Sequence, residues 1–317
     1  MRFYDIFNGD ADGICALHQL RLADPRDATL VTGVKRDIRL LERVPAKQGD
    51  RLTVLDISMR ENGEALRRVL AQGAEVLYFD HHAAGDVPSH PALRAHIGKE
   101  AEVCTSLLVD AFLNGMHRAW AVVGAFGDNL AESALKAAAP LGLQGADVQR
   151  LRELGEALNY NAYGETLDDL HYDPADLYGA VSRYANPFEF IADEPVFDVL
   201  RSACADDLAL AEETRHQAAT PGAAAFVFPD AAWARRIHGI FANRQAVANP
   251  ARAHAVLVRH KGGGYKVSVR APLTRPAGAE ALCSRFPTGG GREAAAGINH
   301  LPESELENFL REFAKAY

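Results

Sequence analysis

The first half of the chain alternates short apolar runs with longer segments of helical periodicity, and this rhythm restricts the fold more than any other feature. The apolar runs are Phe3 to Phe7, Thr29 to Val34, Leu52 to Leu55 and Glu75 to Phe79. Between them, Asp12 to Ala23 and Arg60 to Ala71 carry apolar residues at helical spacing. Strands separated by helices of this length predict βαβ units and a parallel sheet.

The second half has a different pattern, in which one long amphipathic helix, Pro195 to His216, precedes a series of strands. The expected strands are Ala224 to Phe228, Arg236 to Phe241, Ala253 to Arg259 and Tyr265 to Arg270, the last two joined by a glycine turn. A helix over Pro302 to Tyr317 closes the chain. We therefore expect an α/β protein: an N-terminal domain (1–190) with a parallel sheet flanked by helices, a connecting helix (191–220), and a smaller C-terminal α/β domain (221–317) with a mixed sheet.

Acidic residues and two histidines follow the expected strands of the first half. They are Asp10 and Asp12 after the first strand, Asp56 after the third, Asp80, His81 and His82 after the fourth, and Asp128 after the later apolar run Ala119 to Phe126. Because the carboxyl ends of parallel strands meet at one edge, these side chains are expected to converge. Two carboxylates about 4 Å apart repel by about 4 kcal/mol at an effective dielectric near 20, so such a cluster predicts bound cations.

Each of these signals has an ordinary explanation when it is taken alone. An Asp-x-Asp-Gly sequence at a strand end is often only a turn or a helix cap, and a His-His pair is usually surface or packing. The combination at one edge favours a metal centre. Carboxylates with one or two imidazoles suit manganese, and magnesium or iron less well, and a sulfur-free set is a poor structural zinc site. A binuclear centre is the simplest interpretation.

The motifs, in this order, resemble those of the Asp-His-His (DHH) phosphoesterases, a family that includes RecJ exonucleases, nano-RNases and cyclic-dinucleotide phosphodiesterases. The matching segments are Asn8 to Gly13, Asp56, Asp80-His81-His82, Asp128, and the glycine-rich segment Gly289 to Gly297. The resemblance covers nearly the whole chain. It implies a DHH catalytic domain at 1–190 and a DHH-associated substrate-binding domain at 221–317, with a cleft between them.

The resemblance also implies two manganese ions, with magnesium as an alternative. The implied ligands are Asp10 and Asp56 for one ion, and Asp12, Asp56, His81 and Asp128 for the other. Asp56 would then bridge the two ions. Asp80 would orient the histidines or metals, and His82 would face the phosphate and donate a proton to the leaving oxygen.

Three positions depart from the family pattern. Ile6 stands where many members carry a histidine, and Asn8 stands where RecJ proteins carry an acid, so the first metal site is poorer in ligands or uses the Asn8 oxygen. Arg292 replaces a common histidine, and arginine keeps the donors and adds a fixed charge.

Asn161 to Gly164 looks like a RecJ segment near the active site.

The glycine-rich segment predicts a grip on phosphate. Gly289, Gly290 and Gly291 let backbone amides approach an anion, and Arg292 can bind a terminal phosphate with two hydrogen bonds. A helix is expected to start at Ala294 to Gly297, which favours the phosphate interpretation over that of a flexible loop.

Other polar residues have weaker signals. Ser268 and Arg270 resemble a family position that faces the cleft and are assigned to substrate binding. Lys35, Arg36 and Arg39 are either part of a basic wall or ordinary solvated surface, and the sequence assigns them no role.

The charge of the chain limits the class of substrate. With 42 acidic and 34 basic side chains, the formal net charge of -8 would repel a long phosphate backbone. Together with this limit, the family resemblance implies hydrolysis of short RNA or DNA oligonucleotides, or linear dinucleotides such as pGpG, to mononucleotides by a hydroxide that two metal ions activate. The alternatives are a RecJ-like exonuclease on single-stranded DNA and a nucleotide-binding protein without catalysis.

The sequence carries no signal for a membrane. Met1 to Asp10 holds no basic run followed by a long apolar segment, and no later stretch reaches the roughly 18 apolar residues of a spanning helix. A cytoplasmic protein without a membrane partner is expected. Four widely spaced cysteines with no Cys-x-x-Cys pair indicate free thiols in a reducing compartment, and homodimerisation is left open.

Overall fold

A computed structural model describes residues 1–317, the whole sequence. It divides into two compact units, Met1–Ser202 and Ala203–Tyr317, and the division falls inside one long helix, α9 (Pro195–Glu213). No helix combines the length and the apolar composition that crossing a membrane requires. The four cysteines are free thiols, and three of them are buried.

The first unit alternates strands and helices in its first half and is helical thereafter. Its strands are β1 (Phe3–Phe7), β2 (Thr29–Val31), β3 (Arg51–Leu55), β4 (Glu75–Asp80) and β5 (Leu93–Ile97). Its helices are α1 (Ala11–Ala23), α2 (Gly63–Ala71), α3 (Thr105–Phe112), α4 (Arg118–Gly127), α5 (Ala131–Ala138), α6 (Gly145–Asn161), α7 (Pro174–Val181) and α8 (Pro187–Asp193), with short 3-10 turns at Leu40–Arg43, Ala139–Leu141 and Leu167–Asp169.

The five strands form one sheet in the order β2-β1-β3-β4-β5, and every neighbouring pair is parallel. This confirms the predicted parallel sheet. The register aligns Phe7 with Leu55 and Leu55 with Phe79, so three strands reach their carboxyl ends side by side. The edge strand β5 was not expected from the sequence, because its residues are only partly buried and carry no clear apolar run.

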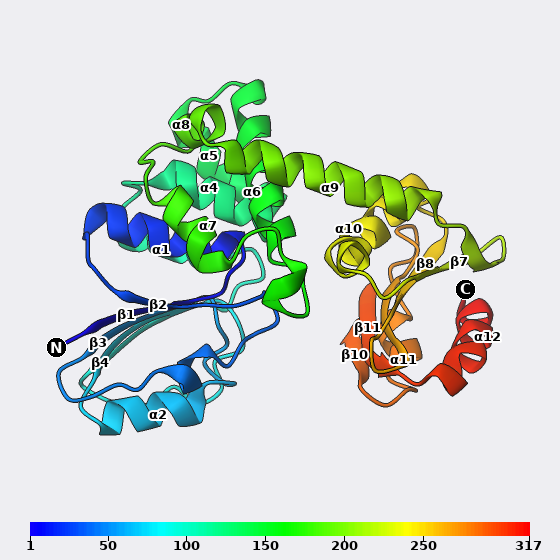
Figure 1. The fold of residues 1–317 in the computed structure, drawn as a ribbon, viewed down its shortest axis with the longest axis horizontal. Helices are drawn as coiled ribbons and strands as arrows, with labels where there is room; N and C mark the ends of the chain where they lie inside the picture. The colour runs from blue at the N-terminus through cyan, green and yellow to red at the C-terminus, as the bar shows by residue number, and fades with distance from the viewer. The chain divides into compact units, whose positions relative to one another are not determined.

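Helices cover both faces of this sheet (Figure 1). On the face that α1 covers, Phe7 packs in one buried cluster with Trp120 of α4. On the face that α2 covers, Ile6 and Val54 pack with Leu66. Successive strand residues point to opposite faces, and each fully buried side chain of this size contributes about 1.5–3 kcal/mol. The two cores therefore hold the strand ends, and the loops that follow them, in a rigid frame.

The second unit is built on a six-stranded mixed sheet in the order β10-β11-β9-β8-β7-β6. Its strands are β6 (His216–Ala219), β7 (Ala223–Phe228), β8 (Ala253–Arg259), β9 (Tyr265–Arg270), β10 (Gly289–Arg292) and β11 (Ala295–Leu301). Its helices are α10 (Ala232–Ala248), α11 (Ala279–Cys283) and α12 (Leu306–Ala316), with a 3-10 turn at Glu303–Glu305. Only β7 and β8 pair in parallel, and the other neighbours are antiparallel.

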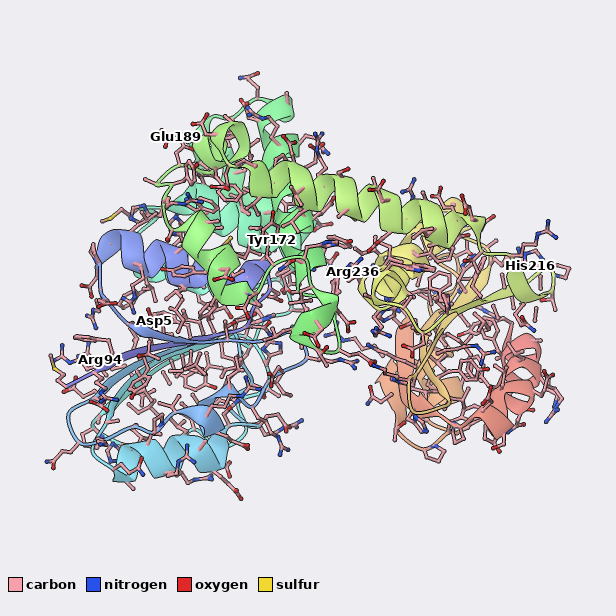
Figure 2. All side chains as sticks on the ribbon, viewed as in Figure 1. Asp5, Arg94, Tyr172, Glu189, His216 and Arg236 are labelled. Atoms are coloured by element: carbon pink, nitrogen blue, oxygen red, sulfur yellow. The ribbon has the colours of Figure 1, made fainter.

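The strand expected at Arg236 to Phe241 is wrong, because these residues lie inside helix α10. Ile237 and Phe241 are four residues apart and both buried, which is the spacing of one helical face rather than of a strand. Phe241 packs against Phe228 of β7, with ring centroids 5.3 Å apart. Arg236, labelled in Figure 2, pairs with Asp207 of α9 at 2.8 Å, so the helix is also tied by a buried ion pair.

Opposite faces of the second sheet are covered by α10 and by α12. Val267 and Val269 of β9 lie in the buried cluster that contains Phe309 of α12. The residues that alternate with them, Ser268 and Arg270, therefore lie on the face where α10 packs.

Candidate active site

The loop after β1 turns directly into α1, and its glycines are needed for the turn. A side chain on Gly9 would lie 2.1 Å from the Gly33 carbonyl oxygen, and one on Gly13 would lie 2.1 Å from the Asn8 carbonyl oxygen. Asp10 is the N-cap of α1, and its Oδ1 accepts hydrogen bonds from the backbone N–H groups of Asp12 and Gly13 at 3.0 Å each. The Asp-x-Asp-Gly sequence is therefore a helix cap, and it also brings two acids to the end of the sheet.

The carboxylate of Asp12 is fully buried and is held by the start of another helix. Its two oxygens accept hydrogen bonds from the backbone N–H groups of Thr105 and Ser106, each at 2.7 Å. These are the first residues of α3, whose N-terminal amides stabilise negative charge. The sequence did not identify Thr105 and Ser106, because nothing in a Thr-Ser pair marks it as the partner of an acid 93 positions away.

Asp56 follows β3 with a φ of 59°, in the left-handed region that a non-glycine residue rarely adopts. This conformation costs on the order of 1 kcal/mol, and such strain is typical of functional sites. The Thr105 hydroxyl donates a hydrogen bond to Asp56 Oδ1 at 3.0 Å. Thr105 thus links Asp12 and Asp56 through its amide and its hydroxyl.

His81 brings the acids of three segments together. Its Nε2 lies 3.4 Å from Asp56 Oδ1, 3.7 Å from Asp128 Oδ2 and 4.0 Å from Asp12 Oδ2. Asp128 follows helix α4 as its C-terminal cap. The predicted convergence is therefore present in the structure for these four residues.

Asp80 and His82 form a separate pair beside this cluster. Asp80 is completely buried, and its Oδ1 lies 2.7 Å from His82 Nδ1 while its Oδ2 accepts a hydrogen bond from the Met59 amide. Burial opposes protonation of His82, but the hydrogen bond to Asp80 outweighs it and raises the pKa of the imidazole. The His82 side chain is 44% exposed, so the ring is accessible to a ligand from solvent.

Lys35, which the sequence did not assign, reaches into the acidic cluster. Its Nζ donates hydrogen bonds to Asp10 Oδ2 at 2.6 Å, to Asn159 Oδ1 at 3.3 Å and to Asp128 Oδ1 at 3.5 Å. The ring of Tyr163 lies 5.8 Å away. Burial lowers the pKa of Lys35, but the charge of Asp10 outweighs it, and the pKa rises well above its usual range.

The crowding of carboxylates changes their ionisation unevenly. Burial, followed by the charges of Asp12 and Asp10, raises the pKa of Asp56 well above its ordinary value. Burial and the charge of Asp12 raise the pKa of Asp128 to about 6. For Asp10, burial acts in the same direction, but the Lys35 ammonium outweighs it and the pKa is lowered. The uncompensated negative charge therefore lies around Asp56 and Asp128.

The residues around His81 fit a divalent cation. Donor atoms of Asp12, His81 and Asp128 lie within 4.8 Å of one another, and so do those of Asp56, His81 and His82. Carboxylate oxygens with imidazole nitrogen suit manganese or magnesium. Asp10, expected to be a ligand, belongs to neither group and is paired with Lys35.

Asn8 does not extend the ligand set around Asp10. Its Oδ1 accepts a hydrogen bond from the Asp10 amide at 3.3 Å, and its Nδ2 donates to the Lys35 carbonyl oxygen at 3.2 Å. The side chain therefore holds two backbone segments together. Ile6 is completely buried in the apolar core.

In the second unit, the glycine-rich segment is a pair of antiparallel strands. The helix expected at Ala294 to Gly297 is wrong, because β11 begins at Ala295 and pairs with β10. We call β10 (Gly289–Arg292) and β11 (Ala295–Leu301) the glycine hairpin. Its row of partners runs from Gly290 through Gly297 to Ser268 of β9, so these three residues lie side by side on the sheet.

The three glycines of β10 differ in their structural need. A side chain on Gly289 would lie 1.9 Å from the Cys283 carbonyl oxygen, and Gly291 has a φ of 150° and no room beside Ala296. Gly290 has nothing within 4 Å of the position that a side chain would take. The fold therefore explains Gly289 and Gly291, but not Gly290.

The two arginines assigned to substrate binding are held differently. Arg270 donates from Nε to Asn243 Oδ1 of α10 at 2.7 Å. Arg292 is exposed at the end of β10. The register aligns Arg292 with Ala295 and Ala295 with Arg270, so the two arginines lie two strands apart in one row, about 10 Å at the usual strand spacing.

No protein-family model matches the sequence, and no curated protein matches it. Solved structures match the fold. A manganese-bound exonuclease RecJ has a TM-score of 0.62 and 19% identity, over 99% of this chain and 90% of that chain. The pGpG-specific phosphodiesterase PggH from Vibrio cholerae has a TM-score of 0.56 and 12% identity over 100% of both chains.

A DHH domain from a protein described as a member of a family of ribosomal proteins has a TM-score of 0.63 and 16% identity, over 99% of this chain and 86% of that chain. The chain therefore has the RecJ-like fold of the DHH proteins, with a parallel sheet in one unit and a mixed sheet in the other.

Proposed function

We propose that this chain is a metal-dependent phosphodiesterase that hydrolyses short oligonucleotides or linear dinucleotides, such as pGpG, to mononucleotides. One observation carries the proposal: three carboxylates and one imidazole from four separate segments converge at the carboxyl edge of the parallel sheet. The repulsion among these carboxylates makes the edge a poor structural element and a good cation site.

A divalent ion, manganese in preference to magnesium, supplies Lewis acidity toward a phosphoryl oxygen and a water nucleophile at neutral pH. Asp12, Asp56, His81 and Asp128 would hold it. The hydrogen bonds from α3 fix Asp12 before any substrate arrives, which is the preorganisation that phosphoryl transfer requires.

His82 is proposed to donate a proton to the leaving ribose oxygen. Its Nδ1 is occupied by Asp80, which leaves Nε2 as the donor toward substrate. The raised pKa keeps the ring protonated closer to neutral pH, the form that a general acid needs. Asp80 acts only through His82, as a positioning residue.

The second unit is proposed to bind the terminal phosphate of the substrate. Gly290 is left open by the fold, and Arg292 is exposed in the same strand, so the glycine hairpin offers both a close backbone approach and a charge. The net charge of -8 disfavours long nucleic acid, which supports a substrate of a few nucleotides. The likeness to PggH over all of both chains supports the same class.

A RecJ-like exonuclease activity on single-stranded DNA is the second candidate, favoured by the higher TM-score of the RecJ structure. The deciding experiment is a panel of pGpG, RNA and DNA strands of increasing length, cyclic dinucleotides and a nucleoside bisphosphate, each with manganese, magnesium or EDTA. We expect manganese-dependent release of mononucleotides from dinucleotides. Faster cleavage of long DNA would favour the second candidate.

A control for contaminating nucleases is the Asp128→Asn variant, purified in the same way and tested on the same panel. Nucleotide binding without cleavage of any substrate by the wild-type chain would overturn the phosphodiesterase proposal and leave a binding protein.

A further inference from the structure

The Lys35 Nζ lies 2.6 Å from Oδ2 of Asp10, one of the two ligands implied for the first ion of the predicted binuclear centre. We infer that the Lys35 ammonium replaces that ion, so that the centre binds a single divalent cation. This inference deepens the proposed function, on which it rests for the identity of the centre. It proposes one ion where the family resemblance implies two.

Lys35 is anchored at its backbone rather than attached loosely to the surface. Its N–H donates to the Ala162 carbonyl oxygen at 3.0 Å, and its own carbonyl oxygen accepts from Asn8 Nδ2 at 3.2 Å. The side chain is only 30% exposed. An anchored backbone and a mostly buried stem give the ammonium one preferred position, beside Asp10.

The ammonium has a full set of partners at this position. Its three oxygen contacts, on Asp10, Asn159 and Asp128, match the three N–H donors of a lysine. Asn159 is itself oriented, because its Nδ2 donates to the Tyr163 hydroxyl at 2.7 Å and leaves its Oδ1 for Lys35. The three oxygen atoms around Nζ therefore match the hydrogen-bonding geometry of an ammonium group.

With Lys35 in place, Asp10 has no free oxygen to offer a second ion, and Asp56, which lies beside it, is the one other ligand implied for that ion. Asp10 Oδ1 accepts two backbone hydrogen bonds and Oδ2 binds Lys35, while Asn8 is turned to the backbone and Ile6 is apolar. Manganese and magnesium favour sites rich in oxygen ligands. By contrast, His81 belongs to two groups of possible ligands, one with Asp12 and Asp128 and one with Asp56 and His82, and Asp10 belongs to neither.

Repulsion would add to this shortage. A divalent ion and an ammonium about 4 Å apart repel by on the order of 8 kcal/mol at an effective dielectric near 20. Binding of an ion to Asp10 would therefore require the Lys35 ammonium to leave its three side-chain partners.

The test is the manganese stoichiometry of the metal-free full-length chain, measured by calorimetric titration and by elemental analysis after desalting. We expect one ion per chain and the six-line electron paramagnetic resonance spectrum of isolated Mn²⁺. Two ions per chain with an exchange-coupled spectrum would overturn the inference.

Variants locate the effect at Lys35. Lys35→Ala is expected to raise the stoichiometry from one ion to two, whereas Lys35→Arg should keep it at one. The matched control is Lys47→Ala, which removes an exposed ammonium before β3, at the other end of the strands. A Lys35→Ala chain that is folded by circular dichroism but still binds one ion would show that Lys35 does not prevent a second ion from binding.

Activity on pGpG, measured on the same samples, separates this inference from the proposed function. An inactive wild-type chain that binds one isolated ion would contradict the function and leave the inference intact. An active chain that binds two coupled ions would support the proposed function and contradict the inference about Lys35.

Discussion

The carboxyl edge of the first sheet and the glycine hairpin of the second carry the residues assigned to phosphate chemistry, yet they are built in opposite ways. At the edge, Asp12 and Asp56 are almost completely buried, and Thr105 hydrogen-bonds to both. In the hairpin, Gly290 is open to its surroundings and Arg292 is exposed.

Under the proposed function, this difference corresponds to two separate requirements, cation binding and phosphate binding. Groups that hold a cation must be fixed before substrate arrives, because reorganising charged groups during the reaction would raise its barrier. A group that only binds a phosphate end need not be buried before the ligand arrives, because its charge-assisted hydrogen bonds form on binding. We therefore expect substitutions at the edge to abolish turnover, and substitutions in the hairpin to weaken substrate binding.

The largest effect is expected for Asp56→Asn at the edge. The amide keeps the size of the side chain and tolerates the left-handed backbone, but it loses the charge that a cation needs. We expect kcat on pGpG to fall by about 1,000-fold or more, while the Tm of the metal-free chain rises because a crowded carboxylate is gone. Activity within tenfold of wild type would exclude Asp56 as a metal ligand.

Arg292→Ala tests the hairpin side of the comparison. Loss of a charge-assisted hydrogen bond of about 1.5–3 kcal/mol predicts a fall in kcat/KM of about 10- to 100-fold, through KM. Because Arg292 is exposed, the Tm should not change. A fall confined to kcat would place the arginine in the chemical step instead, and Arg259→Ala offers an exposed-arginine control on β8 of the same sheet.

Substitutions of Gly289 and Gly290 distinguish a glycine that the hairpin needs in order to fold from one that is proposed to bind phosphate. Gly289→Ala should lower the Tm because its new methyl group meets the Cys283 carbonyl oxygen. Gly290→Ala should leave the Tm unchanged and raise KM by about 10-fold, about 1.4 kcal/mol, through a blocked phosphate approach. Equal KM values for Gly290→Ala and wild type would remove the hairpin backbone from the binding site.

The smallest effect is expected in how the free energy of unfolding of the metal-free chain depends on pH. The Asp128 pKa of about 6 lies above its unfolded value, so the folded chain retains a proton that the unfolded chain loses between about pH 4 and 6. This contribution to the free energy of unfolding must therefore fall as pH rises, by about 1–3 kcal/mol. Urea unfolding of wild type and Asp128→Asn across this window measures the difference, which saturating manganese should reduce. If the free energy of unfolding of wild type instead rose with pH relative to that of Asp128→Asn, folding would lower the pKa of Asp128 rather than raise it.

Much of the carboxyl edge of the first sheet could be predicted from local sequence. Asp12, Asp56 and His81 follow runs of strand character, and parallel strands bring their carboxyl ends to one edge whatever the details of packing. The same reasoning predicted the α/β class and the parallel sheet, because periodicities of 2 and 3.6 residues reflect which side chains face a core.

The errors lie where a short pattern allows two structures. Arg236 to Phe241 has the apolar content of a strand, but its place in α10 depends on which residues meet β7. The sequence Gly289 to Gly297 predicts a loop followed by a helix. In the structure, pairing with β9 makes Gly297 part of a strand.

Local sequence was enough to predict that Asp12, Asp56 and His81 meet at the end of the parallel sheet, because each follows a strand, whereas Asp128 follows helix α4. The position of the Lys35 ammonium among these residues depends on packing of distant segments, since its partners Asn159 and Asp128 are 124 and 93 positions away. A lysine on a surface loop and a lysine in a charged centre look the same along the chain. What distinguishes them is the set of oxygens around Nζ, and that set exists only when the distant segments have packed together.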